Sequence, residues 1–242
     1  MSKYFTDGAL ASRWRSIPGL GFCLLVVLLL SPLLASAHNI SGANARFVEG
    51  LDGPAVIPYL YLGAKHMVTG YDHLLYLVGV VFFLLRLKDV ILYVSLFTLG
   101  HSLTLMGGVL LEWSVNAHLI DAVIGLSVAY KAFENIGGFK QFFSWQLDAR
   151  AAVFIFGLFH GLGLATKLQD LSLSADSLVV NMLSFNVGVE IGQALALAGI
   201  VVVLGLWRRS RYFQRQAFSA NTLLMSLGFM LAAYQFSAYL WS

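Results

Sequence analysis

Histidine and carboxylate side chains recur inside apolar stretches of this sequence. They occur in the segments HMVTGYDH, FTLGHSLTL, FGLFHGLGLA and FNVGVEIGQ, and the residues concerned are His66, Asp72, His73, His101, His160 and Glu190. An ionisable side chain inside a membrane-spanning segment costs about 3 kcal/mol on insertion scales, so such a position is a functional hypothesis by default. Imidazole and carboxylate donors without thiolate suit Ni, Co, Zn, Fe or Mn, and the donor set does not choose among these metals. We therefore predict a shared metal site.

The spacing H-x5-D-H in the first segment allows two geometries. His66 and His73 are seven residues apart, which is about two turns of an α-helix. A continuous helix would align both rings on one face, whereas a bend at Gly70 would bring them closer together. Asp72 either holds an imidazole in one tautomer or acts as a ligand itself, and the spacing leaves both roles open.

Small residues surround the other polar positions, which predicts that they face neighbouring helices instead of lipid. A lone histidine in such a place is also commonly a structural hydrogen-bond donor between helices, but four of them together favour a metal site. Three further residues join the candidate ligands with lower weight: His38, Glu134 and Asn186.

Composition predicts an integral membrane protein. Of the 242 residues, 59% are hydrophobic and 11% are charged, whereas soluble domains carry about 25% charged residues. A soluble globule, a disordered chain and a disulfide scaffold are thereby excluded. The net charge of +3 does not indicate nucleic-acid binding, because the position of cations matters more than their sum in a membrane protein.

The N-terminal residues 1–37 are predicted to be a cleaved secretory signal peptide. Three cations precede the apolar run 22–34, and the small residues Ala35-Ser36-Ala37 follow it. The alternative is a retained first helix. Cleavage would place His38 at the new N-terminus, where its amine and imidazole can chelate one metal ion. It would also remove Cys23, the one cysteine of the chain, so thiolate metal sites and disulfides are excluded from the mature protein.

The mature chain is predicted to be an all-α polytopic membrane helix bundle with six transmembrane helices, or seven if the signal is retained. A short periplasmic N-terminal segment (38–56) precedes the bundle (57–242). About 20 apolar residues span a bilayer, and such segments lie near 70–86, 90–111, 118–134, 150–166, 178–206 and 221–240. The shorter apolar stretch 57–67 is expected to lie at or enter the outer interface.

Basic residues predict the orientation of the bundle. Nine Lys and Arg residues fall in the predicted inner loops and three in the outer segments. Because cytoplasmic loops carry an excess of Lys and Arg, this bias predicts a bacterial inner-membrane protein whose mature N-terminus is on the periplasmic side.

The polar segments, together with AFEN, resemble the HupE/UreJ family of small bacterial membrane proteins, which are encoded near hydrogenase and urease genes and regarded as nickel or cobalt permeases. The resemblance covers most of residues 57–205. It assigns the family's His-x5-Asp-His block to His66, Asp72 and His73 and its Phe-His-Gly block to Phe159-His160-Gly161, and it implies polar positions at His101, Glu134 and Glu190. The best-known members carry a Glu soon after Phe-His-Gly, whereas this sequence continues LGLAT; Glu190 in the next span is the candidate to replace it.

We therefore expect a transporter and not an enzyme: a divalent transition-metal ion, Ni or Co before Zn, is bound in the membrane and carried across it. Its expected partners are the metal ion, membrane lipids and a metalloenzyme maturation system, with no nucleic acid, and the oligomeric state stays open. The sequence contains no nucleotide or flavin motif. One alternative is an intramembrane zinc hydrolase that uses the same His/Asp cluster, with Ser102, Ser184 or Glu190 orienting water or substrate. Another is haem held between paired histidines.

Overall fold

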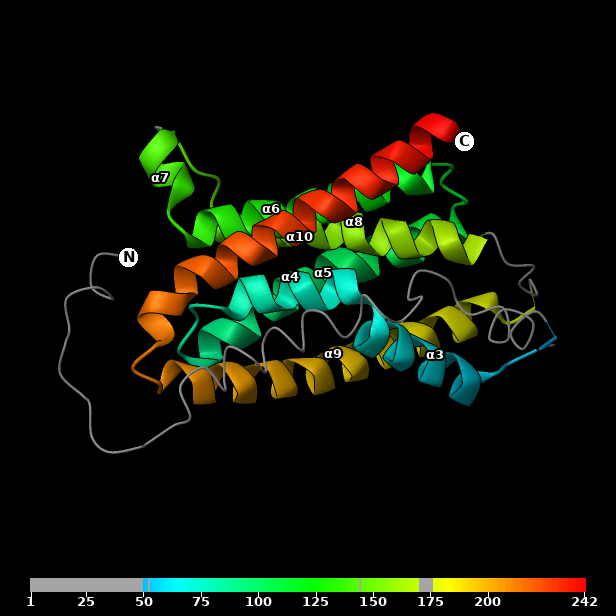
Figure 1. Cartoon of the computed structure of the whole chain (residues 1–242). Helices are drawn as coiled ribbons and strands as arrows, with labels where there is room; N and C mark the ends of the chain where they lie inside the picture. Colours follow the sequence, from blue (N-terminus) through cyan, green and yellow to red (C-terminus); the bar gives the residue numbers. More distant parts are fainter. Residues whose placement is uncertain (1–49, 52, 144, 170–175) are drawn as a thin grey trace.

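The computed structural model describes residues 50–51, 53–143, 145–169 and 176–242 (Figure 1). These residues form helices and no strand, which confirms the all-α prediction. The helices are α3 (Val56–Thr69), α4 (Tyr71–Val81), α5 (Leu87–Leu110), α6 (Ala117–Asn135), α7 (Gly138–Phe142), α8 (Ala149–Gln169), α9 (Leu178–Arg208) and α10 (Phe213–Trp241). The predicted signal peptide and His38 lie outside the described residues.

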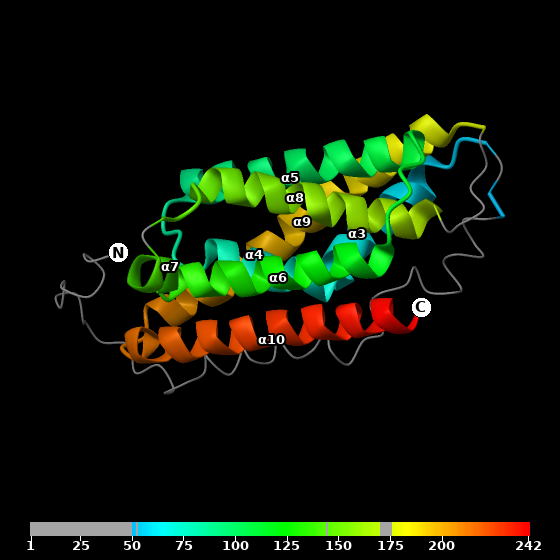
Figure 2. The same ribbon diagram turned by 90° about the horizontal axis from the view of Figure 1, so that it is seen from above.

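Four of the described helices, α5, α8, α9 and α10, are long and apolar enough to cross a membrane. They match four of the predicted spans. A fifth predicted span corresponds to α6, which has 19 residues but carries Asp121, Lys131 and Glu134 and is therefore less apolar. The helices run roughly side by side in two perpendicular views (Figure 2).

The first predicted span, 70–86, is too long, because α4 ends at Val81 after 11 residues. At about 1.5 Å per residue, α4 covers roughly half of the hydrocarbon core of a bilayer. The predicted short helix before Gly70 is confirmed: α3 has 14 residues, and Gly70 separates it from α4 with an extended backbone (φ −70°, ψ 100°). The two helices together form one broken helix.

Helix pairs packed through small residues build the bundle. The most extensive pairings are α5 with α8, α6 with α10, and α3 with α9. Glycines lie at these contacts, and a Cβ atom there would meet the backbone of the partner helix: Gly157 faces Phe97, Gly228 faces Ala129, and Gly188 faces Leu60. Such contacts let helix backbones approach closely.

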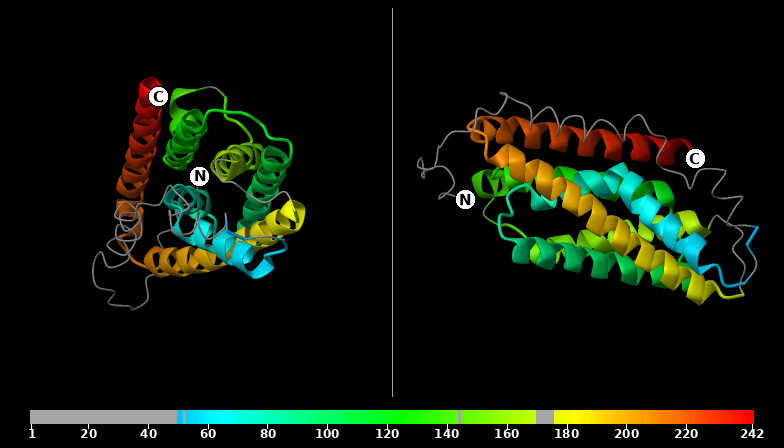
Figure 3. Two further views of the ribbon diagram at one scale, coloured as in Figure 1. Left: turned by 90° about the vertical axis from the view of Figure 1, so that its right-hand side faces the viewer. Right: turned by 90° about the horizontal axis from the view of Figure 1, so that it is seen from below.

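Helix α4 lies at the centre of the bundle. All of its residues except Leu74 are buried, and the view along the bundle shows other helices around it (Figure 3, left). A short helix in this place ends inside the protein, so its last carbonyl groups need hydrogen-bond donors.

Arg208, the last residue of α9, supplies those donors. Its guanidinium donates to the carbonyl oxygens of Leu84 (3.0 Å) and Phe82 (2.7 Å) and to that of Val81. A cation at the C-terminal end of a helix also interacts favourably with the helix dipole. Arg208 therefore ties the end of the central helix to α9.

We predict that Arg208→Gln destabilises the protein by about 2 kcal/mol, because hydrogen bonds from a charged donor to buried carbonyls are lost. The measurement is thermal unfolding of the purified protein in detergent. Arg209→Gln is the matched control, since the exposed neighbour loses the same charge. Equal unfolding temperatures for the two variants would contradict the capping role.

Candidate metal centre

Four imidazole rings from four helices meet in the middle of the bundle. His73 at the start of α4 lies in the centre of this histidine cluster, with ring centroids 5.1 Å from His66 on α3, 5.5 Å from His101 on α5 and 4.9 Å from His160 on α8. His73 is 1% exposed and His101 and His160 are 0% exposed. The structure thus brings together the four histidines that the sequence places in or next to its apolar segments.

Two glycines allow this approach. A Cβ atom at Gly70 would lie 2.9 Å from the carbonyl oxygen of His66 and 3.1 Å from Nδ1 of His73, so a side chain at the break would displace the cluster. A Cβ atom at Gly161 would meet the carbonyl oxygen of His101, which places α8 directly against α5. The bend at Gly70, one of the two predicted geometries, is the one observed.

Asp72 holds His73 in one orientation. Its Oδ1 lies 3.0 Å from the ring Nδ1 of His73 and also accepts from the backbone N–H of that residue. An ionised carboxylate only accepts hydrogen bonds, so with an ionised Asp72 and a neutral His73 this contact would place the ring proton on Nδ1 and leave the lone pair on Nε2. Asp72 therefore makes the contact expected of a residue that fixes a tautomer, the first of its two predicted roles.

Several nitrogen atoms of the histidine cluster are buried without a hydrogen-bond partner among the described residues: His73 Nε2, both ring nitrogens of His101, and His160 Nδ1. A buried polar atom left unpaired costs about 1–3 kcal/mol, and most such atoms in proteins are paired. Unpaired imidazole nitrogens are also the donors that divalent transition metals bind. The donor chemistry of the cluster therefore fits such an ion.

The donors lie close together but do not converge on one point. The three pairs that His73 forms with other histidine rings pack edge to face, with interplanar angles of 68° to 80°. Within the described part of the chain, no group of three or more His, Cys, Asp or Glu side chains is arranged so that it could hold a metal ion. Binding would require the rings to rotate.

The remaining sequence candidates lie away from the histidine cluster. Glu190 is exposed on α9. Glu134, near the end of α6, pairs with Lys131 (2.6 Å) and accepts from Gln146 (2.8 Å). Asn186 accepts a hydrogen bond from Ser102 (3.1 Å). The hydrogen bonds and ion pairs described for Glu134 and Asn186 do not involve a histidine of the cluster.

An aromatic layer beside the cluster was not predicted from the sequence. Tyr76 and Phe97 lie against His160, with ring centroids at 5.1 and 5.0 Å, and Phe156 lies 5.9 Å from Tyr76. Each aromatic residue is three or four positions from a cluster histidine on its own helix, so it lies one turn away on the same face. This spacing could have been used to predict the aromatic layer from the sequence.

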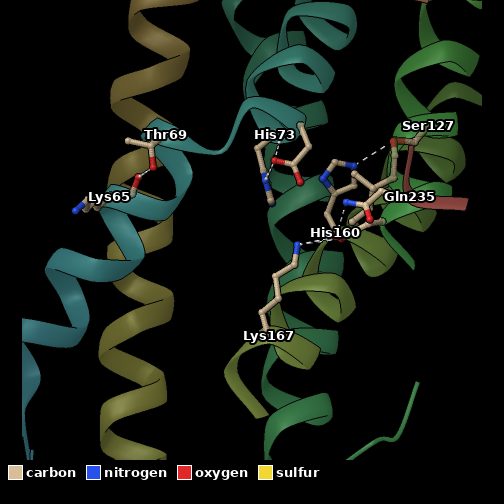
Figure 4. A network of polar contacts seen from close by, with 10 residues as sticks. Lys65, Thr69, His73, Ser127, His160, Lys167 and Gln235 are labelled. Carbon is tan, nitrogen blue, oxygen red and sulfur yellow. Dashed lines mark hydrogen bonds and ion pairs between the residues drawn. The ribbon is translucent and has the colours of Figure 1, made fainter. Parts of the chain in front are cut away.

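A partly buried ion pair lies on the other side of the cluster, toward the C-terminal end of α8. Lys167 Nζ is 2.9 Å from Asp121 Oδ2, and Gln235 donates to the same oxygen at 3.2 Å (Figure 4). Gln235 also bonds to His118 at 2.9 Å. The pair neutralises one cation and one carboxylate inside the bundle and connects α6, α8 and α10.

Comparison with known proteins gives one match. The family model described as HupE / UreJ protein matches residues 43–242. Searches of curated proteins and of solved structures gave no significant match. The matched range contains every residue of the histidine cluster.

We predict that Gly161→Ala destabilises the protein by about 2 kcal/mol, because the added methyl group forces α8 away from α5. Gly199→Ala is the control, since nothing lies within 4 Å of a Cβ atom at that position, and alanine favours a helix over glycine. Thermal unfolding in detergent measures both variants. The close α5–α8 contact would be disproved if Gly161→Ala unfolded at or above the temperature of the Gly199→Ala protein.

Proposed function

The chain belongs to the HupE/UreJ family, and we propose that it carries a divalent transition-metal ion, nickel or cobalt, across the bacterial inner membrane. The family and the apolar helices indicate a multi-pass membrane protein with a role in metal transport. The observation that carries the proposal is the histidine cluster: four imidazoles in ring contact, three of them at most 1% exposed. The proposed ligands are His73 Nε2, His160 Nδ1 and one ring nitrogen of His101, which are buried without a hydrogen-bond partner among the described residues.

The charge distribution supports an inward orientation for one end of the bundle. Exposed cations gather where α4, α6 and α9 end and where α5, α8 and α10 begin; they are Arg86, Lys88, Lys140, Arg150, Arg209, Arg211 and Arg215. We name this the basic end. Cytoplasmic segments carry such an excess, so the basic end faces the cytoplasm in the proposed topology and the start of α3 faces the periplasm.

The ligand set suits transport better than permanent storage. Neutral imidazoles with one neighbouring carboxylate bind nickel or cobalt without the tight cage that several thiolates provide. Conduction needs a site that the ion enters readily and leaves again. Rotation of the edge-to-face rings to bind the ion, and their return to the observed packing, would supply both steps.

The aromatic layer is the barrier in this mechanism. Tyr76, Phe97 and Phe156 lie one turn from the cluster toward the basic end, as the chain directions of α4, α5 and α8 require. Tyr76 and Phe97 are 0% and 1% exposed. In the proposed mechanism, an ion that leaves the histidine cluster toward the basic end passes these rings, and their displacement would open that route.

Neither alternative function gains support. The family match does not favour a hydrolase, and the polar groups considered for its water or substrate lie elsewhere: Ser102 donates to Asn186, Ser184 donates to its own helix, and Glu190 is exposed. For haem, two histidines must face each other across a porphyrin plane. The rings here are in direct contact instead.

We predict that His73→Ala and His160→Ala each lower nickel or cobalt uptake roughly tenfold or more, because each removes a central donor. The measurement is uptake of radioactive metal by cells expressing equal amounts of inserted protein, with binding to the purified protein as a second readout. His118→Ala is the matched control, since His118 bonds to Gln235 outside the cluster. Unchanged uptake by a correctly inserted His73→Ala protein would refute the proposal.

Glu190→Gln should leave metal binding unchanged, because its exposed carboxylate does not contact the histidine cluster. Calorimetric titration of the purified variant with nickel and cobalt measures this directly. A large loss of affinity in this variant would mean that α9 turns Glu190 toward the cluster when metal binds.

A further inference from the structure

Ser127 on α6 makes two hydrogen bonds inside the bundle. It is 0% exposed, and its Oγ lies 2.6 Å from the carbonyl oxygen of Ile124 and 3.1 Å from Nε2 of His160 (Figure 4). The first contact is within α6, and the second connects α6 to the histidine cluster. No motif or spacing in the sequence singled out this serine.

Counting protons decides which partner donates in each bond. A serine hydroxyl has one proton. Two oxygen atoms 2.6 Å apart require a proton between them, and the carbonyl of Ile124 has none to give. The serine proton therefore lies on the bond to Ile124, and toward His160 the hydroxyl only accepts.

We propose that Ser127 is a positioning residue that holds His160 with its proton on Nε2, so that the lone pair lies on Nδ1. The tautomer follows from the hydrogen bonds alone, whereas its use in metal binding rests on the proposed function. His160 Nδ1 agrees with this assignment, because it is buried and has no hydrogen-bond partner among the described residues. The hydroxyl thus selects the nitrogen that a metal ion can bind.

Ser127 and Asp72 then make opposite selections on neighbouring rings. Asp72 occupies Nδ1 of His73 and leaves Nε2, whereas Ser127 occupies Nε2 of His160 and leaves Nδ1. The two rings are 4.9 Å apart between centroids. Outer partners of this kind fix the tautomer and direction of metal-binding histidines, so a metal held by both rings would meet one nitrogen of each type.

The test is nitrogen NMR of the protein with ¹⁵N-labelled histidine, recorded without metal at about pH 8.5, where an ordinary imidazole is neutral. The His160 signal is assigned by its loss in His160→Ala. In the wild-type protein we expect the proton of His160 on Nε2. Ser127→Ala should lose this preference, and Ser127→Thr should retain it, because a threonine hydroxyl can make the same bond to the preceding turn.

Metal titration of the same proteins gives the second readout. We expect Ser127→Ala to lower nickel or cobalt affinity roughly tenfold, with Ser127→Thr close to the wild type. Ser184→Ala is the control, since Ser184 is buried and bonds to its own helix at Val180 (2.8 Å) without contacting a histidine. The control should change neither the spectrum nor the affinity.

Two results would overturn the proposal. One is a wild-type spectrum with the His160 proton on Nδ1, a result that does not depend on the folding of the Ser127→Ala protein. The other is a folded Ser127→Ala protein with unchanged tautomer and unchanged affinity. If the tautomer shifts as expected but the wild-type protein binds no divalent metal, the proposed function fails and the control of the His160 tautomer by Ser127 stands.

Discussion

At Gly70 the backbone is extended between two helices, and the histidines on either side of it come into ring contact at 5.1 Å. The break lets the two helices run in different directions and pack against different partners. Helix α3 packs on α9, whereas α4 turns into the centre, where it contacts α5, α6, α9 and α10. A continuous helix could make only one of these two sets of contacts, because its direction would be fixed over its whole length. The position of His73 among the other histidines therefore depends on this one residue without a side chain.

Packing through small residues makes the rest of the arrangement possible. In lipid, helices gain little from the hydrophobic effect and associate through close contact and interhelical hydrogen bonds. The glycines between α5 and α8 bring His101 and His160 to the same level, and Thr104 adds a hydrogen bond to the carbonyl of Leu158 across this contact (2.6 Å). Toward the basic end, Asn135 donates to Asn221 (2.9 Å) and to the carbonyl of Gly79 (2.8 Å), which ties α6 to α10 and α4.

The sequence predicted best those features that depend on the residues of one segment alone. Apolar length predicted the long helices, and the cost of burying imidazole in hydrocarbon pointed to His66, His73, His101 and His160, which the fold brings together. Prediction from the sequence was weaker where tertiary contacts decide. The apolar run continues past Val81, so only the contact with Arg208 shows why α4 ends there. In the sequence, Glu190 looked like a candidate of the same kind as the histidines. Its exposure depends on which face of α9 packs against α3 and α5, and in the structure Glu190 is exposed.

The charges around the histidine cluster limit how tightly an ion can be held there. Asp121 and Glu134 are each neutralised by a lysine, at 2.9 and 2.6 Å, and Glu190 is exposed on α9. Asp72 is the carboxylate in contact with the cluster, so a divalent ion bound by neutral imidazoles would keep about one uncompensated positive charge. At an effective dielectric constant of about 20, each unit charge 4 Å away changes the energy by roughly 4 kcal/mol. A second carboxylate at the cluster would therefore strengthen the binding of the ion by roughly that amount and slow its release. In the proposed function, the pairing of carboxylates with lysines on both sides of the cluster would keep the ion exchangeable, which is the property a permease needs.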